Sequence, residues 1–287
     1  MTLDPHKLLQ REFPSIEHRY SERDTILYAL GVGVGMDPLE RDALRFVFER
    51  ELRVLPSMAA VLASPGFWVR EPDTGIDWVR VLHGEQDMEF HRPLPCAGTV
   101  RAQTRVTAVV DKGPGKGALI VSERAGHDAA TGERLFTVRQ TTFALADGGC
   151  GNAGRVTAAA APALPERAPD ATCDLRTLPQ AALIYRLSGD TNPLHADPDV
   201  AAAAGFPRPI LHGLCTLGVA GHAILKTLCG YDPARLRSLR VRFTAPVFPG
   251  ETLRTELWRD AGGVSFRARV LERDALVLDH GRATLAG

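Results

Sequence analysis

A short stretch in the second half of the chain carries side chains suited to moving protons. Asp190, Asn192 and His195 lie within six residues, between apolar neighbours. Pro193 disfavours helical backbone at the residue before it, so residues 190–195 should form a bent loop and not a helical turn. On such a loop a carboxylate and an imidazole can face one point, hold a water molecule and transfer protons. Each positioned proton transfer is worth roughly 10²–10⁴ in rate.

Two predicted helices would hold this loop in place. Asp197-Pro198 is typical of a helix N-cap followed by Pro at the first helical position, and it predicts a short helix ending at Gly205. Residues 210–228 are apolar on nearly every face, which predicts a buried helix. Gly213 lies where that helix would begin, so its N–H should be free to stabilise an oxyanion close to the backbone. His212 should start the helix or lie in the core, with contact to substrate as the alternative.

The chain reads as two copies of one unit. Strands are predicted at 237–243, 251–258, 264–272 and 276–285, and the same order recurs at 89–91, 99–109, 118–127 and 133–145. The sequence YALGVG at 28–33 aligns without gaps on YRLSGD at 185–190, which extends the repeat towards the N-terminus. Each copy should be an α+β unit, with an antiparallel sheet wrapped around a central helix.

The two copies differ in their chemistry and in their predicted central helix. Gly33 stands where Asp190 should be, and no histidine follows within twenty residues. The first-copy helix, over residues 55–63, is cut short by Pro65-Gly66 and should be roughly half as long as its counterpart. We assign residues 1–150 to a degenerate first domain, 151–170 to a linker rich in Ala, Gly and Pro, and 171–287 to the second domain.

Composition excludes several classes of protein. Lys plus Arg and Asp plus Glu both number 34, so no overall field attracts nucleic acid or an anionic membrane. The five cysteines form no C-x-x-C pair and no zinc-finger spacing, which favours reduced thiols, no metal site and a cytoplasmic protein. No stretch reaches the roughly 18 apolar residues of a membrane span, and the N-terminus lacks a signal peptide core. The glycines at 31–35 do not have dinucleotide-loop spacing, and we expect no cofactor.

The second-copy segment resembles the hydratase 2 motif of the MaoC-like family of (R)-specific enoyl-CoA hydratases. The resemblance rests on the sequences YRLSGD at 185–190, NPLH at 192–195, DP at 197–198, AGF at 204–206 and PILHGLCT at 209–216. It continues through RF at 242–243, PV at 246–247 and PGETL at 249–253, and into the first copy at DKG 111–113 and GKG 115–117. The two-copy arrangement is similar to the hydratase part of peroxisomal multifunctional enzyme type 2.

This resemblance implies a double hot-dog fold and reversible syn hydration of a trans-2-enoyl-CoA to an (R)-3-hydroxyacyl-CoA in fatty-acid metabolism. It implies catalysis by Asp190 and His195 on a water molecule, with Asn192 assisting and the Gly213 amide as oxyanion donor. The degenerate copy would accommodate the acyl chain, which favours medium or long chains. One departure is the sequence GGCGN at 148–152, where the two-copy group often has Gly-Gly-Phe-Gly-Gly.

Further residues are candidates for binding the substrate. Lys112 and Lys116 lie in a Gly-rich hairpin and could meet CoA phosphates, and Arg208 and Arg186 are similar candidates. Two other functions stay open. One is dehydration of a different 3-hydroxyacyl thioester, either an acyl carrier protein derivative or a branched short-chain CoA. The other is acyl-CoA binding without catalysis. We expect an acyl-CoA partner, no nucleic acid and no membrane, and a chain able to form a homodimer.

Overall fold

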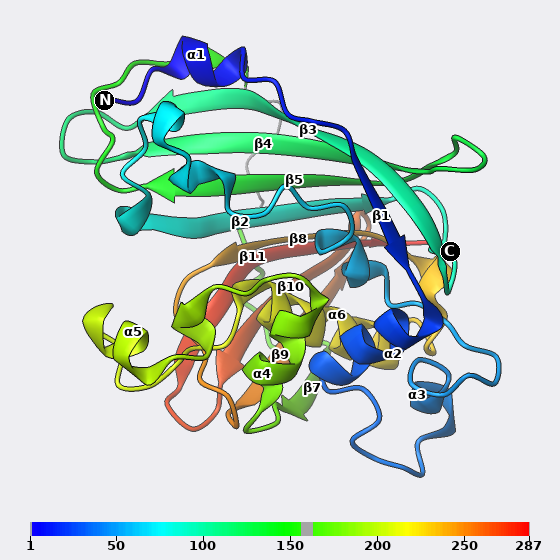
Figure 1. Cartoon of the computed structure of the whole chain (residues 1–287). Helices are drawn as coiled ribbons and strands as arrows, with labels where there is room; N and C mark the ends of the chain where they lie inside the picture. The colour runs from blue at the N-terminus through cyan, green and yellow to red at the C-terminus, as the bar shows by residue number, and fades with distance from the viewer. Residues whose placement is uncertain (1, 156–162, 287) are drawn as a thin grey trace.

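The computed structural model describes residues 2–155 and 163–286. Within them, strands form an 11-stranded sheet that runs β1-β3-β4-β5-β2-β8-β11-β10-β9-β7, with β6 paired to β3 (Figure 1). The strands are β1 Ile16–Tyr20, β2 Val81–Phe90, β3 Gly98–Asp111, β4 Ala118–Asp128, β5 Arg134–Ala144, β6 Ala153–Gly154, β7 Ala171–Arg176, β8 Leu236–Phe243, β9 Thr252–Asp260, β10 Gly263–Val270 and β11 Ala275–Leu285. Every pairing is antiparallel.

The helices are short apart from α6. The α-helices are α1 Pro5–Leu9, α2 Glu22–Gly31, α3 Arg41–Leu44, α4 Ala181–Tyr185, α5 Pro198–Ala203 and α6 Gly213–Leu228. The 3-10 turns are η1 Pro56–Ala60, η2 Trp68–Arg70, η3 Pro72–Thr74, η4 Trp78–Arg80, η5 Arg186–Ser188, η6 Pro193–His195 and η7 Pro233–Arg235. In the described part of the chain, no helix combines the length and the apolar character needed to cross a bilayer.

The strand order confirms the prediction of two copies. The order β1-β3-β4-β5-β2 in the first copy matches β7-β9-β10-β11-β8 in the second, so the two copies mirror each other across the β2–β8 pair. Residues 28–33 and 185–190, aligned from the sequence, also meet in space, because the rings of Tyr28 and Tyr185 lie 5.8 Å apart. The repeat is therefore visible in sheet order and in packing.

The two predicted sheets are joined edge to edge into one. In the junction, Glu85 of β2 lies opposite Arg242 of β8, and the two side chains form an ion pair. Strand β2 was predicted only at residues 89–91, whereas it begins at Val81. Glu85 and Asp87 have low strand propensity. The strand forms because it pairs on both sides, with β5 and with β8.

The central helices differ more than the sequence predicted. Helix α6 has 16 residues, most of them buried, and begins at Gly213, three residues later than the apolar run. In the first copy the predicted half-length helix is a 3-10 turn of 5 residues, η1. The boundary that we drew between the copies falls partly on residues 156–162, outside the described part of the chain, so the domain limits stay a prediction.

Candidate active site

The loop that carries the predicted catalytic residues has a defined local structure. Asn192 has a ψ of 122°, outside the helical region, as expected for a residue before proline. Its side-chain oxygen accepts a hydrogen bond from the N–H of Leu194 at 3.1 Å, which caps the 3-10 turn η6. The expectation of a loop without a helical turn was wrong for residues 193–195, because Asn192 caps and Pro193 starts a single turn.

Two further predictions about this segment are confirmed. The Asp197 side chain accepts hydrogen bonds from Asp199 N and Val200 N at the start of α5, and Pro198 is the first helical residue. Helix α5 ends just before Gly205, which has a φ of +84°. The bent loop is therefore held between η5 on one side and a capped helix on the other.

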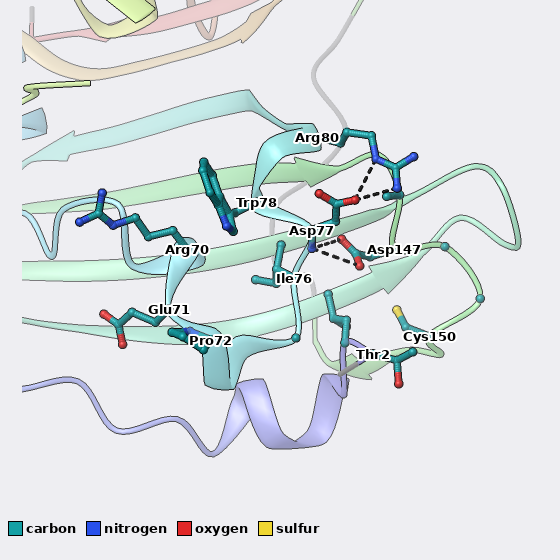
Figure 2. Close-up of a pocket in the computed structure, with 15 residues that line it drawn as sticks. Thr2, Arg70, Glu71, Pro72, Ile76, Asp77, Trp78, Arg80, Asp147 and Cys150 are labelled. Atoms are coloured by element: carbon teal, nitrogen blue, oxygen red, sulfur yellow. Dashed lines mark hydrogen bonds and ion pairs between the residues drawn. The ribbon is translucent and has the colours of Figure 1, made fainter. Parts of the chain in front are cut away.

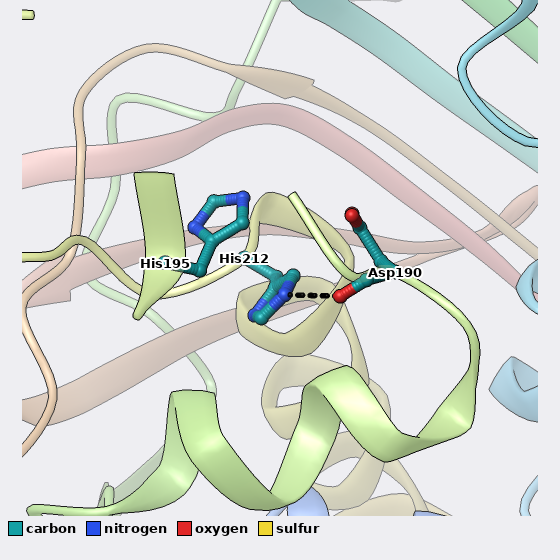
Figure 3. A group of neighbouring side chains, drawn as sticks. All are labelled: Asp190, His195 and His212. Atoms are coloured by element: carbon teal, nitrogen blue, oxygen red, sulfur yellow. Dashed lines mark hydrogen bonds between the residues drawn. The ribbon is translucent and has the colours of Figure 1, made fainter. Parts of the chain in front are cut away.

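Asp190, His195 and His212 form one cluster (Figure 3). One side-chain polar atom from each of the three lies within 4.8 Å of those of the other two. The Nδ1 atom of His195 lies 2.9 Å from the backbone oxygen of Ile210, and Nε2 of His212 lies 3.1 Å from the backbone oxygen of Asp190. Figure 3 shows the three side chains together, with a dashed line from the His212 ring to the backbone oxygen of Asp190. The predicted convergence of the acid and the imidazole is therefore present.

These hydrogen bonds fix which nitrogens carry protons. A backbone oxygen only accepts, so Nδ1 of His195 is the N–H, and in the neutral ring Nε2 keeps a lone pair. Burial lowers the pKa of His195, so its neutral form persists at neutral pH. The same argument makes Nε2 of His212 a donor to Asp190. The cluster thus presents an imidazole lone pair and a carboxylate together, which suits the binding and activation of a water molecule.

His212 lies behind His195 and supports it. Its ring centroid lies 3.8 Å from that of His195, with 28° between the planes, and Tyr185 packs at 5.0 Å. His212 is 1% exposed. Two causes lower the pKa of His212 to about 4: burial, which has the larger effect, and the charge that His195 would carry when protonated. The stacked, buried ring of His212 therefore restricts the plane that the His195 ring can adopt.

Gly213 is the first residue of α6, directly after His212. The first N–H groups of a helix have no partner within the helix, and the helix dipole adds positive potential there. The ring of Phe243 lies over this residue, since a Cβ at position 213 would lie 3.2 Å from Cε1 of Phe243. Glycine therefore leaves the amide accessible where a side chain would be crowded.

One residue near the cluster was not predicted. His83 of β2 lies 4.6 Å from Phe243, ring to ring, and the charge of Asp190 acts on its pKa. Its strand was missed beyond residues 89–91, and the histidine lies in the copy that lacks the motif. The sequence VLHGEQ at 81–86 offered no signal that would bring it to the second copy.

Within residues 2–155 and 163–286, the predicted phosphate-binding residues form no hydrogen bond or ion pair with the side chains of the cluster, and they come from two separate segments of the chain. Lys112 and Lys116 flank a tight hairpin between β3 and β4, at the first copy's end of the sheet (Figure 1). Arg208 is exposed, packs over the Phe248 ring at 4.9 Å and donates to the backbone oxygen of Pro249 at 3.4 Å. Binding of CoA phosphates by these residues stays a prediction.

A cavity of about 770 Å³ lies in the first copy (Figure 2). Its lining residue Gly149 lies close to Pro114, in the hairpin between β3 and β4. Gly149 and Gly151 donate to the Asp111 carboxylate, so the sequence GGCGN folds back beside that hairpin. Charged side chains line much of the cavity, namely Arg70, Glu71, Asp77, Arg80 and Asp147. Such a lining does not suit an apolar acyl chain, and the path of that chain remains a prediction.

Comparison with known proteins shows which family this chain belongs to. A model of the MaoC like domain matches residues 160–279, and a model of the MFE-2 hydratase 2 N-terminal domain matches residues 18–146. The chain is 40% identical to a protein of Arabidopsis thaliana named "Enoyl-CoA hydratase 2, peroxisomal", over 94% of this chain and 92% of the relative. This chain belongs to the MaoC-like hydratase 2 family.

Other members of the family extend the likeness to bacteria and to solved structures. A Mycobacterium tuberculosis protein named "3-hydroxyacyl-thioester dehydratase Y" is 42% identical, over 98% of both chains. A MaoC-like dehydratase structure from Phytophthora capsici superposes with a TM-score of 0.85 at 34% identity, covering 98% of each chain. A more distant structure described as a double hot-dog shares the fold. The family resemblance and the double hot-dog fold predicted from the sequence are confirmed.

Proposed function

We propose that this protein is a hydro-lyase that reversibly hydrates trans-2-enoyl-CoA thioesters to (R)-3-hydroxyacyl-CoA. The observation that carries the proposal is the cluster in which Asp190 and His195 meet beside the start of α6. It combines a group that can take a proton from water, a group that can return one, and a free amide. Enoyl thioester hydration requires each of these three.

In the proposed reaction a water molecule lies between the Asp190 carboxylate and Nε2 of His195. The water oxygen bonds to C3, the C2=C3 electron pair moves towards the thioester carbonyl, and the oxygen of that carbonyl gains negative charge. The Gly213 amide donates to this oxygen at the positive end of α6. The Asp190 and His195 pair takes one proton from the water and delivers one to C2, so the water is added with no net loss of protons.

The other predicted residues have supporting parts in the proposal. Asn192 assists by capping the turn that carries His195, because its side-chain oxygen holds Leu194. His212 positions His195 by stacking and ties the backbone of Asp190 in place. Its burial argues against direct contact with substrate. Lys112, Lys116 and Arg208 are proposed to meet the phosphates of CoA, whose length allows contacts distant from the thioester.

A second candidate is dehydration of another 3-hydroxyacyl thioester, on acyl carrier protein or on a branched short-chain CoA. The Mycobacterium tuberculosis relative is named as a 3-hydroxyacyl-thioester dehydratase, and this name states no carrier, which supports the second candidate. The same cluster would serve, since dehydration is the reverse reaction. Retention of Asp190 and His195 together argues against a binding protein without catalysis.

A role in β-oxidation, a cytoplasmic location and a homodimer are further parts of the proposal, although the Arabidopsis relative is named as peroxisomal.

Loss of enoyl absorbance across a C4 to C16 series of trans-2-enoyl-CoA thioesters tests the proposal. The same acyl groups on acyl carrier protein are the matched comparison. We expect turnover of the CoA series, with medium or long chains preferred over crotonyl-CoA. Turnover of the carrier protein series alone would favour the second candidate, and no turnover of either series would contradict both.

A further inference from the structure

The first copy places one side chain against the candidate site of the second. The ring of His83, near the start of β2, lies 4.6 Å from the ring of Phe243, the last residue of β8, with 56° between the planes. Phe243 in turn lies over Gly213, where an added Cβ would meet its ring at 3.2 Å. Neighbouring side chains therefore connect β2 of the first copy with Gly213, the first residue of α6.

A hydrogen bond fixes the His83 ring. Its Nε2 lies 3.0 Å from Oε1 of Gln86, and because a carbonyl oxygen accepts, Nε2–H donates. Gln86 is 1% exposed and lies in the same strand. Strand β2 pairs with β5 on one side and β8 on the other, so its backbone lies in the middle of the joined sheet. The ring is therefore held by a rigid element and a buried amide.

His83 also lies within the electrostatic reach of Asp190. Burial lowers the pKa of His83 to about 4, while the Gln86 hydrogen bond and the Asp190 charge act in the opposite direction. The ring is consequently neutral at neutral pH. It packs on Phe243 without placing a positive charge beside the carboxylate that handles the water.

We propose that His83 is a positioning residue that the degenerate copy supplies to the second copy's site. Its ring holds Phe243 against Gly213 and so fixes the direction of the amide that receives the thioester oxygen. This inference rests on the proposed hydratase function. Because the oxygen carries its charge mainly in the transition state, a displaced amide lowers kcat more than it changes KM.

Three substitutions at His83 separate this role from general packing. His83→Ala removes the ring, and we expect kcat to fall roughly 10- to 100-fold with KM little changed. His83→Phe keeps an aromatic ring on Phe243 and should restore most of kcat. His83→Asn keeps a donor for Gln86 without the ring and should remain slow. Thermal unfolding of each variant shows whether the fold has been kept.

A double-mutant cycle with Phe243→Ala tests whether His83 acts through that ring. We expect Phe243→Ala to lower kcat to a similar extent, and the double variant to be no slower than the slower single variant. As a readout besides turnover, a conjugated aromatic enoyl-CoA bound to the wild type should absorb at longer wavelength than when free. That shift should shrink in His83→Ala and recover in His83→Phe.

The outcomes distinguish failure of this inference from failure of the proposed function. Wild-type kcat in His83→Ala, full additivity in the cycle, or equal rescue by Phe and Asn would overturn the positioning role and leave the hydratase intact. A folded wild-type protein that hydrates no enoyl thioester would overturn the proposed function and this inference together.

Discussion

The two copies share a strand order and differ at the point where the central helix begins. In the second copy a 16-residue helix starts at Gly213, directly beside Asp190 and His195. In the first copy Gly33 aligns with Asp190, and the central element is a 5-residue 3-10 turn. The comparison teaches that one sheet architecture can be kept twice while the chemistry is kept once, because the site depends on a helix start and one loop.

In the first copy, one buried side chain supplies hydrogen bonds to the backbone oxygens of the short central turn. Arg124 of β4 is buried, and its Nη2 donates to the backbone oxygens of Ala59 at 3.0 Å and Ala60 at 2.8 Å. Burial lowers the pKa of Arg124 to about 10. In α6 the corresponding carbonyl groups bond to amides further along the helix. A shortened helix thus leaves carbonyl groups that a buried guanidinium must satisfy.

The largest expected effect comes from the catalytic pair of the second copy. Asp190→Asn or His195→Gln should lower kcat by at least ~10³ while leaving the fold intact, because each removes a proton-transfer role that the other cannot fill. Steady-state kinetics on one enoyl-CoA, with thermal unfolding of each variant, measures both quantities.

The first copy supplies a matched control for this test. Asp37 accepts a hydrogen bond from the N–H two residues on, at Leu39, as Asp190 does from Asn192. Asp37→Asn should leave kcat within about twofold of wild type, since surface substitutions are usually mild. Comparable losses of kcat in Asp37→Asn and Asp190→Asn would contradict the assignment of the chemistry to the second copy alone.

Substitution of Arg124 should cost the first copy stability. Arg124→Met leaves the Ala59 and Ala60 oxygens buried without their donor, and we expect a loss of about 2–4 kcal/mol in the free energy of unfolding. Urea unfolding at equilibrium measures it. Arg101→Met is a control on the neighbouring strand, because Arg101 pairs with Glu17 at the exposed surface. Equal stability of the two variants would show that the short turn needs no buried cap.

Gly213→Ala tests the start of α6. The added Cβ would lie 3.2 Å from the Phe243 ring, so the ring or the helix start must shift, and kcat should fall roughly 10- to 100-fold. Gly221→Ala, within the same helix, meets the end of the flexible Leu239 side chain at 3.3 Å. It should retain near wild-type kcat. A Gly213→Ala variant as active as Gly221→Ala would argue against an oxyanion role for this amide.

The smallest expected effect is on pH dependence. Burial lowers the pKa of His195, and protonation removes the lone pair on Nε2. An ordinary histidine has a pKa of about 6.5. Activity should therefore persist as the pH falls past that value, and should be lost only as the pH falls through the lower pKa of His195 in the folded protein. The pH profile of kcat/KM for the wild type measures this. An acid limb with its midpoint above the ordinary value would contradict the assignment of His195.

Much of the second copy could be predicted from local sequence, because its signals are local. Turn residues bounded four of its strands, β8 to β11, to within two residues, and Asp197-Pro198 marked a helix start that the structure confirms, whereas β7 was not predicted. Strand β2 was largely missed, since its charged residues form a strand only when their partners on β5 and β8 are present. The stacking of His212 on His195 and the approach of His83 both depend on tertiary packing, which spacing along the chain cannot give.

Hydration in D₂O tests the central claim most directly, namely that a single cluster in the second copy handles both the water and the C2 proton. Because Asp190 and His195 act from one side of the bound substrate, the oxygen at C3 and the deuterium at C2 should be added syn. The family resemblance predicts the (R) configuration at C3. NMR and chiral analysis of the product from crotonyl-CoA determine both centres. Anti addition, or a dominant (S) alcohol, would contradict the account.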